Sequence, residues 1–84
     1  MPNNRNQHEI RLRKLLCDET DVTDEMINQM TTEGIRKVTD FFSGKNGKIR
    51  SLSIDDKGYP INVFVEKSDG TLLITSLYGK ENHD

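Results

Sequence analysis

The side chains that most often carry out chemistry are few in this chain and lie far apart. Cys17 is the single cysteine, and the two histidines, His8 and His83, lie near opposite ends of the 84 residues. A metal site needs several ligands that converge on one point, and Cys17 with His8 supplies too few. We interpret Cys17 as a small residue at the end of a helix, and we expect no metal, no cofactor and no small-molecule substrate.

Two further segments carry residue types that occur in active sites. Asp55 and Asp56 are adjacent acids, but neighbouring side chains of a strand point to opposite faces, so the two are poorly placed for a shared acid–base step. They also lack the ligand spacing of a calcium loop. The segment 43–47 has two glycines and a lysine, but it follows an expected helix, whereas a phosphate-binding loop precedes one. We therefore expect no catalytic residue and no enzyme activity.

The elements that would position any site are clearest in the C-terminal half of the chain. Two turn signals, at 56–59 and 67–70, separate three strand-like segments, at 48–55, 60–66 and 71–77. Gly58 and Gly70 supply the positive φ that tight hairpins need. The pattern predicts a three-stranded antiparallel β-meander.

Two helices are expected before these strands. In residues 8–17, three leucines share one helical face. In residues 23–42, the apolar side chains keep to one half of the circumference on both sides of Gly34, which favours one continuous helix. Gly34 lies in that apolar half, where its missing side chain would let another element approach closely. The predicted fold class is α+β, with two N-terminal helices followed by the meander, in the order α-α-β-β-β.

The length and composition limit the class of protein. Eighty-four residues with 32% hydrophobic and 31% charged side chains suit one small domain, 1–84, in which we expect the polar segments 1–7 and 79–84 to be flexible tails. No apolar run is longer than three residues, which is too short for a transmembrane helix or a signal-peptide core. Because a single cysteine gives no disulfide framework, we expect a cytoplasmic protein.

The strands carry more apolar side chains than one helical layer can cover. In the third strand, Leu72 and Ile74 share one face, and Leu73 and Leu77 share the other. Because the helices would cover only one face of the sheet, some apolar surface should stay open to a partner. The outer strands of a meander also leave two open edges that another chain can extend.

We therefore expect a non-catalytic module that binds a protein through the face or edge of its sheet, as an inhibitor, adaptor or regulatory subunit, or that associates with itself. Aromatic side chains give large contact areas at a low cost in entropy. The expected contact residues are therefore aromatic and apolar side chains of the strands with two charged residues at their rim. They are Tyr59, Phe64, Leu73, Leu77, Lys57 and Glu66, which we expect on the face of the sheet away from the helices.

A second interpretation is a winged helix-turn-helix regulator that binds DNA. If Thr31 and Thr32 begin a separate helix, three helices precede a hairpin, which is the order of that fold. The net charge of −2 and the absence of any basic residue between 18 and 33 disfavour DNA as a partner. A non-helical turn at 30–33 would make this the leading interpretation. The basic contact residues would be Arg36, Lys37, Lys48 and Arg50, with the turn around Lys57 as the wing.

Overall fold

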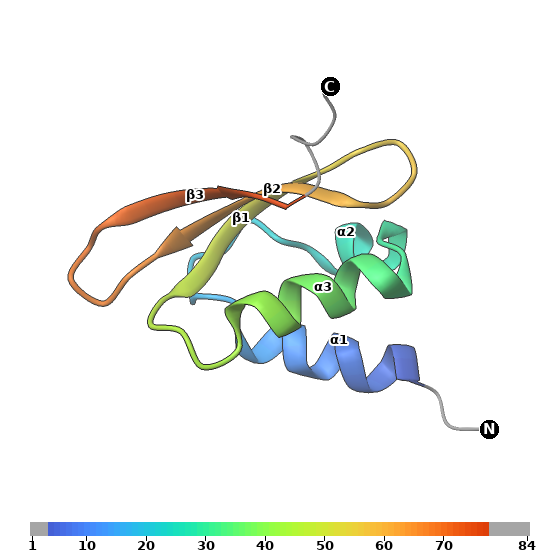
Figure 1. Ribbon diagram of the computed structural model, residues 1–84, viewed down its shortest axis with the longest axis horizontal. Coiled ribbons are helices and arrows are strands. Elements are labelled where there is room, and N and C mark those ends of the chain that lie inside the picture. Colours follow the sequence, from blue (N-terminus) through green and yellow to red (C-terminus); the bar gives the residue numbers. More distant parts are fainter. Residues whose placement is uncertain (1–3, 78–84) are drawn as a thin grey trace.

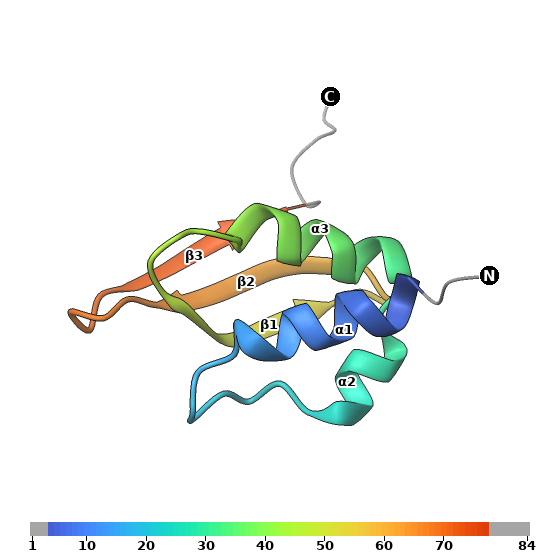
Figure 2. The ribbon, with the colours of Figure 1, turned by 90° about the horizontal axis from the view of Figure 1, so that it is seen from below.

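In the computed structural model, which describes residues 4–77, a layer of helices lies against one face of a sheet (Figure 1). Within these residues, three helices precede three strands: α1 (Asn4–Lys14), α2 (Asp24–Gln29), α3 (Thr32–Phe42), β1 (Lys48–Ile54), β2 (Pro60–Glu66) and β3 (Leu72–Ser76). Helices α1 and α3 pack against each other and lie side by side in front of the sheet when the molecule is seen from the helix side (Figure 2). The predicted α+β class, with helices before an antiparallel meander, is confirmed.

The three strands match their predicted boundaries to within one residue. Strand β2 pairs antiparallel with β1 on one side and with β3 on the other. Gly58 has φ 92° and Gly70 has φ 89°, so the positive φ expected at both hairpin turns is confirmed. In the second turn, Asp69 Oδ1 accepts a hydrogen bond from the Thr71 amide at 2.9 Å, which is the usual way in which an aspartate closes a turn.

The two outer edges of the meander differ. Along β1, the connector after α1 pairs with the strand: the Ile49 amide donates to Leu15 O at 2.7 Å, and the Cys17 amide donates to Ile49 O at 3.0 Å. The Asp21 amide donates to Arg50 O at 2.8 Å. The outer edge of β1 is therefore partly covered, and the expectation of two open edges is wrong. Within residues 4–77, no strand pairs with the outer edge of β3.

The expected single helix over 23–42 is also wrong, because the helix breaks at Met30 and Thr31. Both residues are extended, with ψ 147° and 156°. The guanidinium of Arg5 in α1 donates to Ile27 O at 2.9 Å and to Met30 O at 2.8 Å. These carbonyls lie at the end of α2, where a helix leaves its last acceptors without internal partners. Arg5 therefore satisfies the backbone groups that the break exposes.

The start of α3 is stabilised by a different pair of hydrogen bonds. Thr31 Oγ1 accepts from the Gly34 amide at 2.9 Å, as an N-cap residue does. The Thr31 amide donates to Gly58 O at 2.9 Å, which connects the helix break to the β1–β2 turn. A Cβ added at Gly34 would lie 2.7 Å from Pro60 Cδ. The expectation that Gly34 permits close approach is confirmed, and the approaching element is the start of β2.

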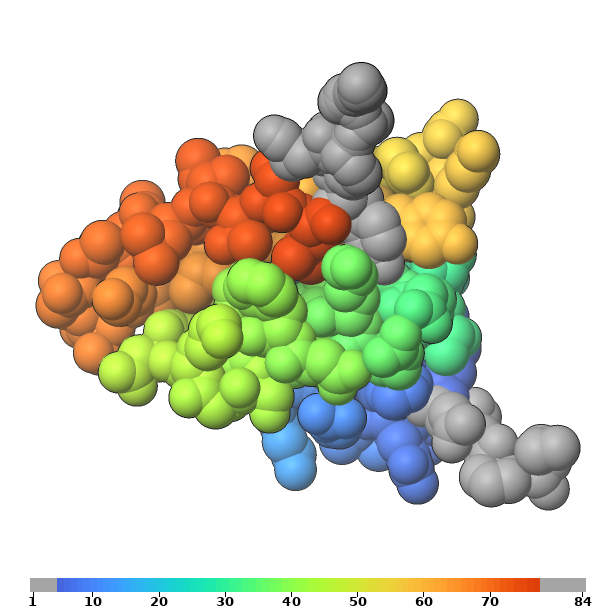
Figure 3. All heavy atoms as spheres, in the orientation of Figure 1, coloured from blue at the N-terminus to red at the C-terminus, as the bar shows by residue number. Residues whose placement is uncertain are grey.

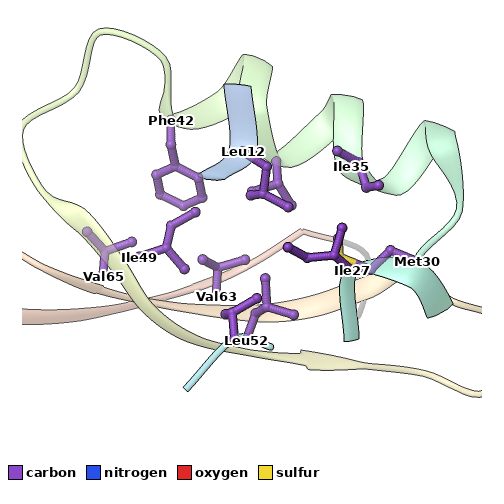
Figure 4. Packing of buried hydrophobic residues seen from close by; sticks show 11 residues of the cluster. Leu12, Ile27, Met30, Ile35, Phe42, Ile49, Leu52, Val63 and Val65 are labelled. Carbon is purple, nitrogen blue, oxygen red and sulfur yellow. The ribbon is translucent and has the colours of Figure 1, made fainter. Parts of the chain in front are cut away.

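The hydrophobic core lies between the helices and the first two strands (Figure 4). It consists of Leu12, Val22, Ile27, Met30, Ile35, Val38, Phe42, Ile49, Leu52, Val63 and Val65. No residue of β3 belongs to this set of buried residues. Among the described helices, none is both long and apolar enough to span a membrane.

Helix α1 begins earlier than expected. Residues 4–7, which we expected to belong to a flexible arm, are helical. Arg5 and Glu9 form an ion pair of 2.8 Å one turn apart, an arrangement that favours helix in this polar segment. The rest of the expected tails, 1–3 and 79–84, lies outside the described residues.

Candidate functional site

Strand β3 exposes an unusual amount of apolar surface for a strand. Leu72 is 64% exposed, Leu73 47% and Ile74 66%. Within residues 4–77, only Ile10 and Phe41 are comparable large apolar side chains. Figure 3 shows β3 at the surface along one border of the molecule. Three consecutive exposed apolar residues on an outermost strand are typical of a surface that another chain covers.

The hydrogen bonds between β2 and β3 determine which backbone groups of β3 point outward. The Lys67 amide donates to Thr71 O at 2.8 Å, and the Leu77 amide donates to Ile61 O at 3.1 Å. In an antiparallel pair, residues with their backbone groups toward the partner strand alternate with residues that point away. Residues 71, 73, 75 and 77 therefore bond to β2. The amides and carbonyls of the intervening residues point to the open edge: Leu72, Ile74 and Ser76.

The register also places the side chains of β3 on its two faces. Ile74 lies opposite Phe64, and Leu73 lies opposite Val65. Val65 belongs to the core, so Leu73 is on the helix side of the sheet and Ile74 is on the outer face. Leu72 and the half-buried Phe64 share that outer face. We call Phe64, Leu72 and Ile74 the outer-face patch.

The structure places the expected contact residues in three different environments. Phe64 lies on the outer face, as expected. Glu66 also lies there, but it accepts a hydrogen bond from Arg50 at 3.0 Å. Leu73 and Leu77 lie on the helix side, and Leu77 packs against the core, so the expectation of both on the outer face is wrong.

Tyr59 and Lys57 belong to the β1–β2 turn. Tyr59 is half-buried and Lys57 is exposed. The Tyr59 amide donates to Asp55 Oδ1 at 2.9 Å, and the Lys57 amide donates to the same oxygen at 3.0 Å. These two residues lie beyond the N-terminal end of β2, at the opposite end of that strand from Glu66.

Leu72 and Ile74 are the most exposed apolar residues of the described chain, and the expected contact set omits them. The signal that could have found them is the length of the second turn. In a regular antiparallel pair, each step forward along one strand is matched by a step back along the other. A turn that pairs Lys67 with Thr71 therefore also places Phe64 opposite Ile74, three residues further along each strand. A one-residue change in this register would reverse both faces of β3.

The basic residues of the DNA-binding alternative do not form one basic surface. Arg36 lies on α3, where it pairs with Glu33 and with Asp40 Oδ2, the latter at 3.0 Å. The hydrogen bond to the Glu33 carboxylate is the main reason why the pKa of Arg36 is raised. The exposed side of α3 therefore presents as much negative as positive charge. Lys37 is half-buried on the same helix.

Lys48 and Arg50 lie on β1. Lys48 Nζ donates to Lys14 O at 3.0 Å. Arg50 pairs with Glu66 at 3.0 Å and lies 4.0 Å from a Glu19 oxygen. The hydrogen bond to Glu66 raises the pKa of Arg50. Both arginines of the alternative are thus held by carboxylates of the chain itself.

An open cleft of about 510 Å³ lies beside the N-terminal end of β1. It is lined by side chains of both charges, including Glu19, Lys48 and Lys67, and by Cys17. In the described range, no group of three or more His, Cys, Asp or Glu side chains is placed to hold a metal ion. The cleft is open to solvent and its lining is mostly charged and polar, so it lacks the enclosed apolar walls of a typical small-molecule site.

Comparisons of the chain with protein-family models, with curated proteins and with solved structures find no match. The features of the described residues that bear on function are therefore the open edge of β3 and the paired charges of α3 and β1.

Proposed function

We propose that this protein is a non-catalytic binding module that pairs the open edge of β3 with a strand of another chain. The observation that supports this proposal is the coincidence of two features on one strand. Leu72 and Ile74 are about two-thirds exposed, and the same residues direct their amides and carbonyls to the open edge. A strand added there would satisfy the backbone groups and cover the side chains.

The composition of β3 supports binding at this edge. Natural proteins protect open edges with lysine, proline, bulges or covering loops. Strand β3 carries only leucine, isoleucine, threonine and serine, and its pairing with β2 is regular. The outer edge of β1 is partly covered by the chain itself. Within residues 4–77, β3 is thus the one outer strand whose edge is left unprotected, which is the pattern expected of an edge that has a partner.

The side chains of β3 indicate the chemistry of a matching strand. The outer face offers Ile74 and Leu72, and the helix side offers Leu73. An added strand would therefore meet apolar groups on both of its faces. Full burial of one such side chain contributes about 1.5–3 kcal/mol. We expect the partner strand to be apolar on both faces, and we propose a regulatory role, as an inhibitor or adaptor.

The experiment compares Ile74→Lys with Ile10→Lys as tagged proteins in cells of the natural source, followed by cross-linking and mapping of the cross-links. Ile74 is 66% exposed and Ile10, on α1, is 47% exposed, so both variants should fold, which circular dichroism can check. The proposal predicts one stoichiometric protein, cross-linked to β3, with wild type and Ile10→Lys but not with Ile74→Lys. Equal recovery by both variants, or cross-links confined to other elements, would contradict it.

One observation favours a second candidate function, a helix-turn-helix protein that binds DNA. The break at Met30 and Thr31 gives two consecutive helices joined by a tight turn. Against this function stand the carboxylates that hold Arg36 and Arg50, because DNA affinity depends on cations that are free to pair with phosphates. Binding of a random-sequence duplex at low salt, weakened by Arg36→Glu and not by Ile74→Lys, would make this the better account.

A further inference from the structure

We infer that the chain that occupies the edge of β3 is a second copy of this protein, related by a two-fold axis at Ile74. The inference deepens the proposed function and rests on it. The two β3 strands would run antiparallel and join the two meanders into one continuous sheet. Three features of β3 support a second copy: the symmetry of its outward backbone groups, the pattern of its side chains and its lack of charge.

The outward backbone groups are arranged symmetrically about Ile74. The residues that point to the open edge are Leu72, Ile74 and Ser76, as the pairing of β2 with β3 requires. In the two-fold arrangement, Ile74 lies opposite Ile74 of the second copy, and Leu72 lies opposite Ser76. Each outward amide then meets an outward carbonyl, which gives about six hydrogen bonds between the copies.

Other two-fold registers use the edge less completely. An axis at Leu73 would place Ser76 opposite Gly70, which lies in the β2–β3 turn and not in the strand. An axis at Thr75 would place Leu72 opposite a residue beyond the end of β3. Only the axis at Ile74 pairs the strand with itself over its whole length.

The outer-face patch becomes continuous in this register. Phe64 lies opposite Ile74 within one copy. The two-fold axis therefore produces a row of Phe64 and Ile74 from one copy followed by Ile74 and Phe64 from the other. Ile74, the most exposed apolar side chain of the described residues, lies at the centre of this row, and apolar cross-strand pairs of this kind stabilise sheets.

The strand carries no charge that would oppose its own copy. Residues 71–77 contain no Asp, Glu, Lys or Arg. Like charges placed directly opposite each other destabilise a strand pair, and their absence removes the usual obstacle to self-pairing. The edge is therefore compatible with a second copy of itself in its backbone hydrogen bonds, in its apolar side chains and in its lack of charge.

The experiment is a charge exchange at the axis, read by sedimentation equilibrium on the full chain. We expect the wild type to be dimeric. Ile74→Lys alone and Ile74→Glu alone should each weaken the dimer by about 100-fold or more, since like charges then replace the central apolar pair. An equimolar mixture of the two variants should form heterodimers, because in this register the introduced lysine of one copy lies directly opposite the introduced glutamate of the other. The matched controls, Ile10→Lys and Ile10→Glu, should remain dimeric.

Each other outcome has a definite meaning. A wild type that stays monomeric at millimolar concentration overturns the inference that the partner is a second copy. The proposed function is then still tested by the cross-linking experiment, which compares Ile74→Lys with Ile10→Lys. A dimer that persists in both Ile74 variants places the contact elsewhere and also overturns the inference. Heterodimers that fail to form in the mixture contradict the axis at Ile74. If the variants do not fold, amide hydrogen exchange in the wild type tests the inference. Protection of the Leu72, Ile74 and Ser76 amides on association supports the dimer, and its absence overturns it.

Discussion

Two glycines with almost the same backbone conformation should respond very differently to substitution by alanine. Gly58 has φ 92° and Gly70 has φ 89°. A Cβ at Gly70 would meet nothing within 4 Å, whereas a Cβ at Gly58 would lie 2.4 Å from Gln29 O and 3.1 Å from Thr31 N. Both contacts are with backbone atoms at the junction of α2 and α3, which cannot move without disturbing the helix break.

The expected magnitudes follow from these distances. Alanine at positive φ costs about 1–2 kcal/mol, and this cost is common to both variants. At Gly58 the backbone must also separate, which lengthens the hydrogen bond from the Thr31 amide to Gly58 O, now 2.9 Å. Leaving such buried backbone groups unpaired costs about 1–3 kcal/mol. We expect a loss of about 1–2 kcal/mol for Gly70→Ala, and a further 1–3 kcal/mol, or about 2–5 kcal/mol in total, for Gly58→Ala.

The assay is urea and thermal unfolding followed by far-ultraviolet circular dichroism. For a domain of this size, 1 kcal/mol corresponds to a shift in Tm of about 4–8 °C, so the two variants should be clearly separated. Both variants share the change in the entropy of the unfolded chain, and the difference between them isolates the contact with α2 and α3. Equal losses of stability would refute the reasoning that the β1–β2 turn is docked on the helix break.

The remaining predictions concern the helix break, the second turn and the outer face. Arg5→Ala should lower the free energy of unfolding by about 2 kcal/mol, because charged hydrogen bonds to the α2 carbonyls are lost, and Arg5→Lys should recover only part of it; no loss in urea unfolding would contradict this. The hydrogen bond from Thr71 lowers the pKa of Asp69 below its usual 3.8. The ionised Asp69 carboxylate therefore stabilises the fold fully above pH 3.8, and this stabilisation is lost as the pH falls through the lower pKa of the folded protein. Asp69→Ala should therefore flatten the acid dependence of stability in that range, and an unchanged profile would argue against the turn contact. Phe64→Ser should weaken association while Lys48→Glu leaves it intact, and the reverse result by sedimentation would favour electrostatic binding.

The strands could be predicted from the sequence because their information is local. Short runs rich in apolar residues, bounded by turns that contain glycine, define the strands, and Gly58 and Gly70 have the positive φ that the turns require. The break between α2 and α3 could not be predicted in this way. It depends on Arg5, which is 25 residues from Met30, and on Gly58 O from the β1–β2 turn. The apolar pattern continues across the break because both helices face the same core.

Some features of the candidate site can be predicted from the sequence, and others cannot. An apolar third strand and its open edge follow from composition and topology, but the faces of β3 depend on its register with β2. That register pairs Phe64 with Ile74, and it moved Leu73 and Leu77 to the helix side. The covered edge of β1 depends on residues 15–21, a connector with no strand pattern of its own.

Amide hydrogen exchange along β3, measured by NMR on dilute and concentrated wild-type protein, tests the central claim that the open edge of this strand is the binding surface. Leu73 and Thr75 direct their amides to β2, so their exchange should be slow at both concentrations. The amides of Leu72, Ile74 and Ser76 should exchange fast in the dilute protein and become slow on association. Fast exchange of these three amides in the associated protein would contradict the claim. Slow exchange of the same amides already in the dilute monomer would contradict it as well.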